Sequence, residues 1–299
     1  MKGKISEDKV VNVAVYILLA FVGIVTLYPF YYTIICSFND GLDLMKGGVY
    51  LCPRKFTLSN YELFIGDEGW RHAFFVSVAR TIVGTVLCTG FTSMFSYALS
   101  RNNLMFKKGY RFLVIFTMYF SGGLIPLYLV VKQLHLINTR GIIVLLGSIS
   151  VYNIIIARSF FTSSIPKELQ EAAFVDGCTN QRFFVSIVVP ISKPIIAVIT
   201  LYCAISYWNS FFNAMIYLND RNKFPLQLVL REILLSFQVM QQQAASGGGV
   251  DAETIAEMNT LVEVVKYGVI VVAAVPVLFI YPFIQKYFVK GVMIGAVKG

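Results

Sequence analysis

The sequence predicts an all-α integral membrane protein that crosses the bilayer six times. The chain has 299 residues, of which 57% are hydrophobic and only 14% are charged, and its mean hydropathy is +0.70. Soluble domains carry roughly 25% charged residues, so this composition indicates a chain surrounded mainly by lipid. Two further observations support the class: the apolar runs have the length of membrane spans, and Lys and Arg are unevenly distributed between the connecting loops.

Six apolar segments are long enough to cross the hydrocarbon core as helices, which takes about 20 residues. They cover residues 10–38, 72–99, 112–134, 141–161, 187–217 and 262–288. The first follows three lysines, as a signal peptide would, but its apolar run is too long and no small-residue cleavage site follows. We therefore expect a retained span. In the third segment, Gly122, Gly123 and Pro126 predict a break.

Basic residues indicate the orientation, because Lys and Arg accumulate in cytoplasmic loops. With six spans, both termini share one side with the loops near residues 100–111 and 158–193. That side carries 14 basic and 5 acidic residues, whereas the other carries 10 basic and 11 acidic residues. The sequence therefore predicts cytoplasmic N- and C-termini. The 14 basic residues are Lys2, Lys4, Lys9, Arg101, Lys107, Lys108, Arg111, Arg158, Lys167, Arg182, Lys193, Lys286, Lys290 and Lys298.

Three connections lie on the predicted outer side. The loop over 39–71 contains turn-forming residues, and the loop over 135–140 is short. The longest, over 218–261, begins with FPLQLVLREILLSF, whose periodicity predicts an interfacial or cavity-side helix. Its Gln- and Gly-rich continuation, MQQQAASGGGVDAETIAEM, predicts a mobile segment. The apolar face of the helix comprises Leu226, Val229, Leu230, Ile233, Leu234 and Phe237.

Cysteine and histidine usage argues against a metal centre. The five cysteines have no paired spacing, so we expect isolated small hydrophobic residues and no disulfide or metal framework. Only two histidines occur, which argues against a His-based metal site or a Ser-His-Asp triad. The net charge of +9 follows from the loops of one side, so no nucleic-acid partner is predicted. The cysteines are Cys36, Cys52, Cys88, Cys178 and Cys203.

One predicted cytoplasmic loop contains its own helix signals, in QEAAFVDGCTNQRFFVSIVVPISKP at residues 170–194. Pro166 suits a helix start, Gly177 suits the position after a helix end, and Thr179 or Asn180 can cap a second short helix. Pro190 and Pro194 then redirect the chain. Small Ala172 and Ala173 would allow close approach of a partner, and Phe174, Phe183 and Phe184 could fill pockets. These residues are compatible with two interpretations of the loop, a docking site for a partner protein and a purely structural turn.

The stretch EAAFVDGCTNQRFFVSIVVPISKP resembles the EAA loop of permease subunits of bacterial type I ABC importers. That pattern has Glu-Ala-Ala, three residues, Gly, and then an apolar-Pro ending; Cys178 stands where the family usually has Ala. The stretches FTLSNYELF, SYALSR, GLIPLYLVVKQLHLINTRGII and KYFVKGVMIGAVKG resemble the maltose-permease-like half of the carbohydrate-uptake branch. FSGGLIP, YNIIIARSFF and YWNSFFNAMIYLNDRNKFPLQLVLREIL resemble its subgroup for complex oligosaccharides and polysaccharide fragments. The resemblance covers essentially the whole chain.

The resemblance implies one permease domain over 1–299 in the bacterial cytoplasmic membrane, with a coupling loop at about 163–193. It implies four kinds of partner: a second homologous permease, two ATPase subunits, an extracytoplasmic sugar-binding protein and an oligosaccharide. ATP and Mg would be bound by the ATPase subunits, with no cofactor in this chain. The C-terminal KYFVKGVMIGAVKG resembles a tail that reaches between the ATPases, with a membrane-surface anchor as the alternative. The residues implied in ATPase coupling are Glu171, Ala172, Ala173, Asp176 and Gly177.

The residues alone also favour a transport subunit that does not hydrolyse ATP. The sequence contains no G-x-x-x-x-G-K-[ST] phosphate-binding motif. An alternative is a secondary transporter driven by an ion gradient, but such carriers use intramembrane carboxylates, which the spans almost entirely lack. A membrane scaffold without transport activity would not explain the polar residues of the fifth span.

The fifth span contains the predicted substrate pathway. A sugar needs hydrogen-bonding groups and flat apolar faces around a cavity. Asn209 and Asn213 are four residues apart and so share a helix face, which Ser206 and Tyr202 extend. The alternative is that these residues pack neighbouring helices together. The pathway candidates in this span are Tyr202, Ser206, Asn209, Phe212 and Asn213.

Arg80 is the one charge that lies clearly within a predicted span. An intramembrane charge is a candidate functional residue. It would face the cavity and assist acidic sugars, or else extend to the membrane surface or form a structural pair. All these readings stay open from the sequence.

Overall fold

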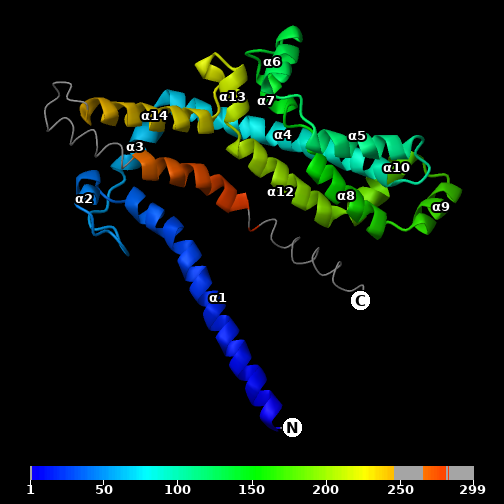
Figure 1. The fold of residues 1–299 in the computed structure, drawn as a ribbon, viewed down its shortest axis with the longest axis horizontal. Helices are drawn as coiled ribbons and strands as arrows, with labels where there is room; N and C mark the ends of the chain where they lie inside the picture. The colour runs from blue at the N-terminus through cyan, green and yellow to red at the C-terminus, as the bar shows by residue number, and fades with distance from the viewer. Residues whose placement is uncertain (1, 246–264, 281, 283–299) are drawn as a thin grey trace. The chain divides into compact units, whose positions relative to one another are not determined.

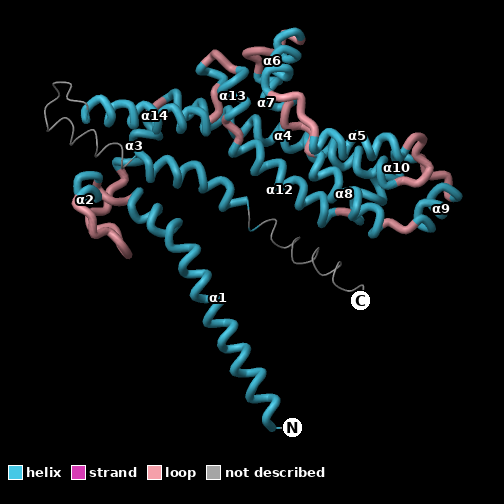
Figure 2. The backbone as a smooth tube through the Cα atoms, in the orientation of Figure 1, coloured by secondary structure: helices cyan, strands magenta, loops and turns pink. Residues whose placement is uncertain are grey.

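The computed structural model describes residues 2–245, 265–280 and 282. These residues form helices joined by turns and loops (Figure 2), and the described part has no strand beyond one isolated bridge between Asn39 and Phe56. The described residues fall into two compact units, one within 1–68 and 230–275 and the other within 69–229 and 276–299. The predicted helical class is confirmed for the described part of the chain.

Two described helices are long and apolar enough to cross a membrane as single elements. They are α1 (Lys2–Ser37), from Lys9 onward, and α4 (Glu68–Ser100), both labelled in Figure 1. Counting each of two bent helix pairs as one span would raise the number to four, and Val265–Ile280 is a shorter apolar helix. The count of six spans stays a prediction.

The predicted break in the third apolar segment is confirmed. Helix α5 (Lys107–Tyr119) ends before the two glycines, and α6 (Leu124–Gln133) follows at an angle of 113°. Gly123 has a φ of +88°, a conformation that glycine adopts without the steric penalty of a Cβ.

The fourth and fifth apolar segments also break, although the sequence predicts them as continuous. The fourth divides into α7 (Arg140–Leu145) and α8 (Val151–Ser164), because Ser150 caps α8 by accepting a hydrogen bond from the amide of Asn153 at 3.4 Å. The fifth divides into α12 (Lys193–Asn209) and α13 (Phe212–Tyr217).

In the first unit, α1 is an apolar helix exposed along most of its length. No residue in its most apolar window is buried, and a helix that is apolar on every side requires lipid or protein around it. The last turn of α1 contributes Ile35 and Cys36 to a small core with Leu44 and Val49.

A polar network folds the segment after α1, which includes α2 (Gly41–Met45) and α3 (Ser59–Gly66). The Oδ1 of the fully buried Asn39 accepts from the amides of Arg54 and Lys55 at 2.8 and 3.0 Å. Its Nδ2 donates to Asp43 Oδ2 at 3.1 Å, and Arg54 Nε donates to the same oxygen at 3.0 Å. This predicted loop is therefore an ordered structure built around one asparagine.

In the second unit, α4, α8 and α12 pack around a common core, together with the short helix α10 (Asn180–Phe183) (Figure 1). Phe161 from α8, Phe183 from α10 and Val188 are fully buried in this core. Helix α5 packs against α8. The core thus connects the long helix α4 to the segment that follows α8.

A second core lies where α6, α7 and α13 meet. Tyr217 of α13 is fully buried there, and its ring stacks on Tyr128 of α6 with centroids 6.0 Å apart. A 3-10 turn (Arg221–Lys223) and α14 (Leu226–Ala245) follow. The three helix pieces left by the breaks are therefore packed together.

Helix α14 agrees in part with the predicted outer helix. On the predicted face, Leu226, Val229 and Leu230 are buried, and Ile233 and Leu234 are half-buried. The side chain of Phe237 lies outside the described residues. Helix α14 continues through residues 240–245, the start of the segment predicted to be mobile. Residues 246–261 lie outside the described part, and the mobility stays a prediction.

Two of the five cysteines pair, contrary to the expectation of isolated residues. Cys88 of α4 and Cys203 of α12 form a disulfide, with Cα atoms 6.3 Å apart and a sequence separation of 115. Because the pairing depends on the packing of two distant helices, cysteine spacing carried no signal for it. Cys36, Cys52 and Cys178 are not part of this disulfide.

Candidate functional site

Helix α9 (Lys167–Val175) is closed at its C-terminal end by a compact turn. The amide of Gly177 donates to the carbonyl of Phe174 at 3.0 Å, and the amide of Cys178 donates to the carbonyl of Ala173 at 2.9 Å. This pair of bonds is a Schellman motif, which satisfies carbonyls that a helix end leaves unpaired. Gly177 has a φ of +77°, so the predicted glycine turn is confirmed.

One face of α9 packs on the core of this chain. Ala173 is buried and Phe183 is fully buried, both within the core shared with α8 and α12. The partly exposed ring of Phe174 meets Phe183 at 65° with centroids 5.9 Å apart, and the half-buried Phe184 lies 5.0 Å from the Tyr97 ring. The expectation that Ala173 and Phe183 face a partner is therefore wrong, because both hold α9 on its own subunit.

The other predicted coupling residues lie on the surface. Glu171, Ala172, Asp176 and Gly177 are all exposed. Asp176 forms the C-cap of α9 and Gly177 the turn that follows it. These four residues are thus exposed on α9 and on the turn that follows it, while Ala173 holds the helix on the core.

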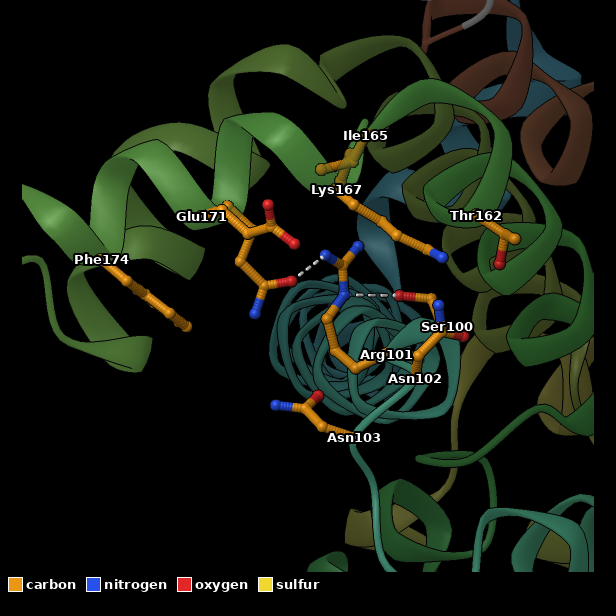
Figure 3. A pocket seen from close by; sticks show the side chains of 10 residues that line it. Ser100, Arg101, Asn102, Asn103, Thr162, Ile165, Lys167, Glu171 and Phe174 are labelled. Carbon is orange, nitrogen blue, oxygen red and sulfur yellow. Dashed lines mark hydrogen bonds between the residues drawn. The ribbon is translucent and has the colours of Figure 1, made fainter.

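A hollow of about 320 Å³ lies between α9 and the C-terminal end of α4 (Figure 3). Arg101 crosses it: its Nη1 donates to Gln170 Oε1 at 2.8 Å and its Nε donates to Ser100 Oγ at 3.1 Å. The guanidinium also lies over the Tyr97 ring, 4.7 Å from its centroid. Arg101 therefore joins the last turn of α4 to α9.

A second helical run follows the turn and bends sharply into α12. Thr179, one of the two expected caps, accepts from the amide of Arg182 at 3.4 Å. Helix α10, a π-helical turn (Phe184–Val188) and α11 (Val189–Ile191) are continuous, and this run meets α12 at 85°. Pro194 lies in the first turn of α12. The segment after the turn is thus joined to α12 by a helical run with one sharp bend.

Helix α12 carries Tyr202, Ser206 and Asn209 on one face, and all three are exposed. Asn213 does not continue this face, because α12 ends at Asn209 and Ser210 has an extended backbone. Asn213 is half-buried on α13, where Phe212 is 48% exposed. The predicted helix face is therefore wrong beyond Asn209.

An open hollow of about 520 Å³ borders this face of α12. Tyr202 and Ser206 line it from one side, and Ser150, Tyr152 and Asn153 line it from the start of α8. Hydroxyl and amide groups beside aromatic rings suit a sugar, which presents hydroxyls and apolar C–H faces. The three α8 residues are additions to the predicted set, and the polar stretch SISVYN within the fourth apolar segment is the sequence signal that marks them.

Arg80 is buried, with 4% of its surface exposed. Its Nη2 donates to the backbone carbonyls of Tyr207 and Ser210, the latter at 2.9 Å. These carbonyls lie at the C-terminal end of α12, where a helix leaves acceptors unpaired. Of the alternatives, the geometry favours a structural pairing, in which Arg80 ties α4 to the end of α12.

No group of three or more His, Cys, Asp or Glu side chains within the described residues is arranged to hold a metal ion.

Comparison with known proteins identifies the family of the chain. The binding-protein-dependent transport system inner membrane component family matches residues 90–294. The polygalacturonan/rhamnogalacturonan transport system permease protein YtcP of Bacillus subtilis is 37% identical over 98% of this chain and 100% of its own length. An arabinooligosaccharides transport system permease protein, AraQ of Halalkalibacterium halodurans, is 27% identical over 94% of both chains.

A solved structure has the same fold. The crystal structure of a bacterial ABC transporter involved in the import of the acidic polysaccharide alginate includes a chain that is 30% identical, with a TM-score of 0.80. The likeness covers 94% of this chain and 98% of that chain. The protein therefore belongs to the family of binding-protein-dependent transport system inner membrane components, among the permeases of sugar and oligosaccharide ABC importers.

Proposed function

We propose that this chain forms half of the translocation pathway of an ATP-driven oligosaccharide importer in the bacterial cytoplasmic membrane. The observation that carries the proposal is 37% identity to a polysaccharide-fragment permease along essentially the whole chain. In this proposal the chain spans the membrane six times with both termini in the cytoplasm. A second permease completes the pathway, an extracytoplasmic binding protein delivers the sugar, and two ATPase subunits supply energy. ATP and Mg bind to those subunits and this chain holds no cofactor.

The α9 turn is the proposed contact with one ATPase. Glu171, Ala172, Asp176 and Gly177 present a surface that a cleft of the ATPase would enclose. Ala173 contributes from the buried side, by seating α9 on the core. Because a bonded path runs from α9 through Arg101 to α4 and a continuous helical run leads to α12, rigid-body motion of the ATPase would reach both helices.

The exposed polar face of α12 is the proposed sugar contact. Tyr202 and Ser206 line a hollow that is open in the single chain, as half of a shared cavity would be, and Asn209 is exposed on the same helix face. Phe212 and Asn213 of α13 are proposed sugar contacts beyond the end of this face. Arg80 supports this face from behind, by holding the end of α12.

Uptake by membrane vesicles containing the complete transporter tests the proposal. Labelled oligosaccharide should accumulate only with ATP and the binding protein, and a proton ionophore should leave the initial rate unchanged. Uptake that needs no ATP and collapses with the ionophore would instead identify an ion-driven carrier. The described helices α5 to α8, α12 and α13 contain no Asp or Glu, which favours the first result.

A further inference from the structure

Five cationic side chains gather around the C-terminal end of α4. They come from the connection after α4 and from α5, α8 and α9. Arg101 and Lys167 line one hollow, Lys107 and Arg158 donate to the last carbonyls of α4, and Arg111 lies one helical turn after Lys107 on α5. We call this group the basic cluster. Its members are Arg101, Lys107, Arg111, Arg158 and Lys167.

The basic cluster is neutralised only in part by this chain. Arg158 Nε donates to the carbonyl of Leu99 at 3.3 Å, and Lys107 Nζ donates to the carbonyl of Ser100 at 3.4 Å and to Asn102 Oδ1 at 2.9 Å. These bonds satisfy the end of α4, whose dipole is equivalent to about half a negative charge. Five positive charges against that partial charge leave a large excess.

Carboxylates do not supply the missing negative charge. Among the described residues no Asp or Glu forms an ion pair with any member of the basic cluster. Glu171 lines the same hollow as Arg101 and Lys167 (Figure 3), yet it makes no ion pair with either. The Nε of Arg111 is buried and has no hydrogen-bond partner in the described part of the chain. Buried donors of this kind are normally satisfied, so the basic cluster lacks an acceptor that an anion could supply.

The surroundings of the basic cluster indicate what kind of molecule carries that anion. Met105 and Phe106, which immediately precede Lys107, are 75% and 79% exposed. Phe112, one residue beyond Arg111, is 70% exposed and begins an aromatic row along α5, stacking on Phe116 with centroids 5.9 Å apart. An anionic head beside an exposed apolar surface that continues along a helix matches the chemistry of a phospholipid.

We propose that the basic cluster binds the phosphate headgroup of an anionic phospholipid, whose acyl chains lie along the aromatic face of α5. The inference depends on the placement of the chain in a bilayer and is independent of which sugar is moved. Since Arg101 also bonds to Gln170 of α9, the bound headgroup would lie against the same side chains that fix the proposed coupling helix.

The test measures lipid bound to the complete purified transporter in detergent, by native mass spectrometry during titration with phosphatidylglycerol or phosphatidylcholine. The test variant is Lys107→Gln with Arg111→Gln. The matched control is Lys108→Gln with Arg182→Gln, which removes the same charge from two exposed side chains near the same helices. Each basic group near an anionic lipid surface strengthens binding about 5-fold, so the test variant should bind phosphatidylglycerol about 30-fold more weakly. The control should bind it like the native chain.

Two further measurements keep the outcome decisive. Thermal unfolding in phosphatidylcholine alone shows whether the test variant is folded. If it is not, Arg111→Lys replaces it, because this substitution keeps the charge and changes only the hydrogen-bond donors. Arg111→Lys should bind phosphatidylglycerol more weakly than the native chain. Inorganic phosphate at millimolar concentration should not displace the lipid. Equal phosphatidylglycerol binding by native, test and control proteins would overturn the proposal, and so would full displacement by inorganic phosphate, which would identify a site for a free anion. If the native transporter bound the lipid as expected but showed no ATP-driven sugar uptake, that result would count only against the proposed function.

Discussion

The ring of Tyr207 in α12 lies directly against Gly84 in α4. A Cβ added at Gly84 would meet three ring carbons of Tyr207 at 2.5 to 2.6 Å, and one added at Gly147 would meet the same ring at 2.8 Å. The hydroxyl of Tyr207 donates to the carbonyl of Val144 at 2.6 Å. Two glycines that are distant in sequence therefore form the slot that holds one tyrosine, close to the proposed sugar-binding face.

Replacing Gly84 with Ala should destabilise the protein, because the added methyl group forces the aromatic ring or α4 to shift. Overpacking of this kind costs about 1–3 kcal/mol. The measurement is the thermal unfolding of the purified transporter, with Gly90→Ala as the matched control, since nothing lies within 4 Å of a Cβ at Gly90 on the same helix. Equal unfolding temperatures for the two variants would contradict the close packing.

Replacing Arg80 with Gln should lower stability and leave the choice of sugar unchanged. The substitution removes charge-assisted bonds to the end of α12, and a hydrogen bond to a charged group contributes about 1.5–3 kcal/mol. Two quantities are measured: the thermal unfolding temperature, and the competition between neutral and acidic oligosaccharides for uptake. The control is Arg140→Gln, because Arg140 is exposed. A stable Arg80→Gln protein that loses only acidic sugars would show instead that this arginine contacts substrate.

Substituting Gly177 tests the turn that closes α9. Valine is strained at a φ of +77° by about 1–2 kcal/mol, whereas Asn tolerates the left-handed conformation. Gly177→Val should therefore lower the ratio of sugar transported to ATP hydrolysed, and Gly177→Asn should retain most of it. Membrane insertion, followed by the amount of assembled transporter, should not change. A normal ratio for the valine variant would remove this turn from coupling.

Filling the hollow beside α12 should block transport. Ser206→Trp places a large ring in the space of about 520 Å³, so uptake should fall at least 10-fold while the ATPase subunits still copurify. Ser206→Ala keeps the hollow open and should transport at near the native rate. If both variants transport equally well, Ser206 belongs to helix packing and not to the pathway.

Acid should loosen the segment after α1. The hydrogen bond from Asn39, followed by those from Arg54, lowers the pKa of Asp43 below its ordinary value. A carboxylate with a lowered pKa contributes stability above its unfolded pKa of about 3.9, and that contribution is lost as the pH falls through the lower folded value. The protection factors against hydrogen exchange over residues 39–61, which correct for the slower intrinsic exchange in acid, should therefore fall below about pH 4. Asp43→Asn should reproduce faster exchange at pH 7, and the exposed Glu62→Gln should not.

Local signals predicted much of the architecture and only part of the site. The break after α5 and the glycine turn after α9 were predicted because glycine and proline act on the backbone within a few residues. The breaks at Ser150 and Ser210 were missed, because a serine within an apolar run is compatible with both a continuous and a capped helix. Asn209 and Asn213 were placed on one face for the same reason, since the spacing rule assumes an unbroken helix.

By itself, the sequence determined the helical membrane class and the turn built around Gly177, since composition, periodicity and turn chemistry are read from neighbouring residues. The family was indicated by the resemblance of the stretch around Glu171 and Gly177 to a known loop. Only the tertiary structure decided that Ala173 and Phe183 belong to the chain's own core, that Tyr152 and Asn153 join Tyr202 around one hollow, and that Arg80 reaches carbonyls 127 and 130 residues away. These outcomes depend on which helix faces pack against each other. Contacts between segments that are distant in sequence cannot be read from the residue spacing within either segment.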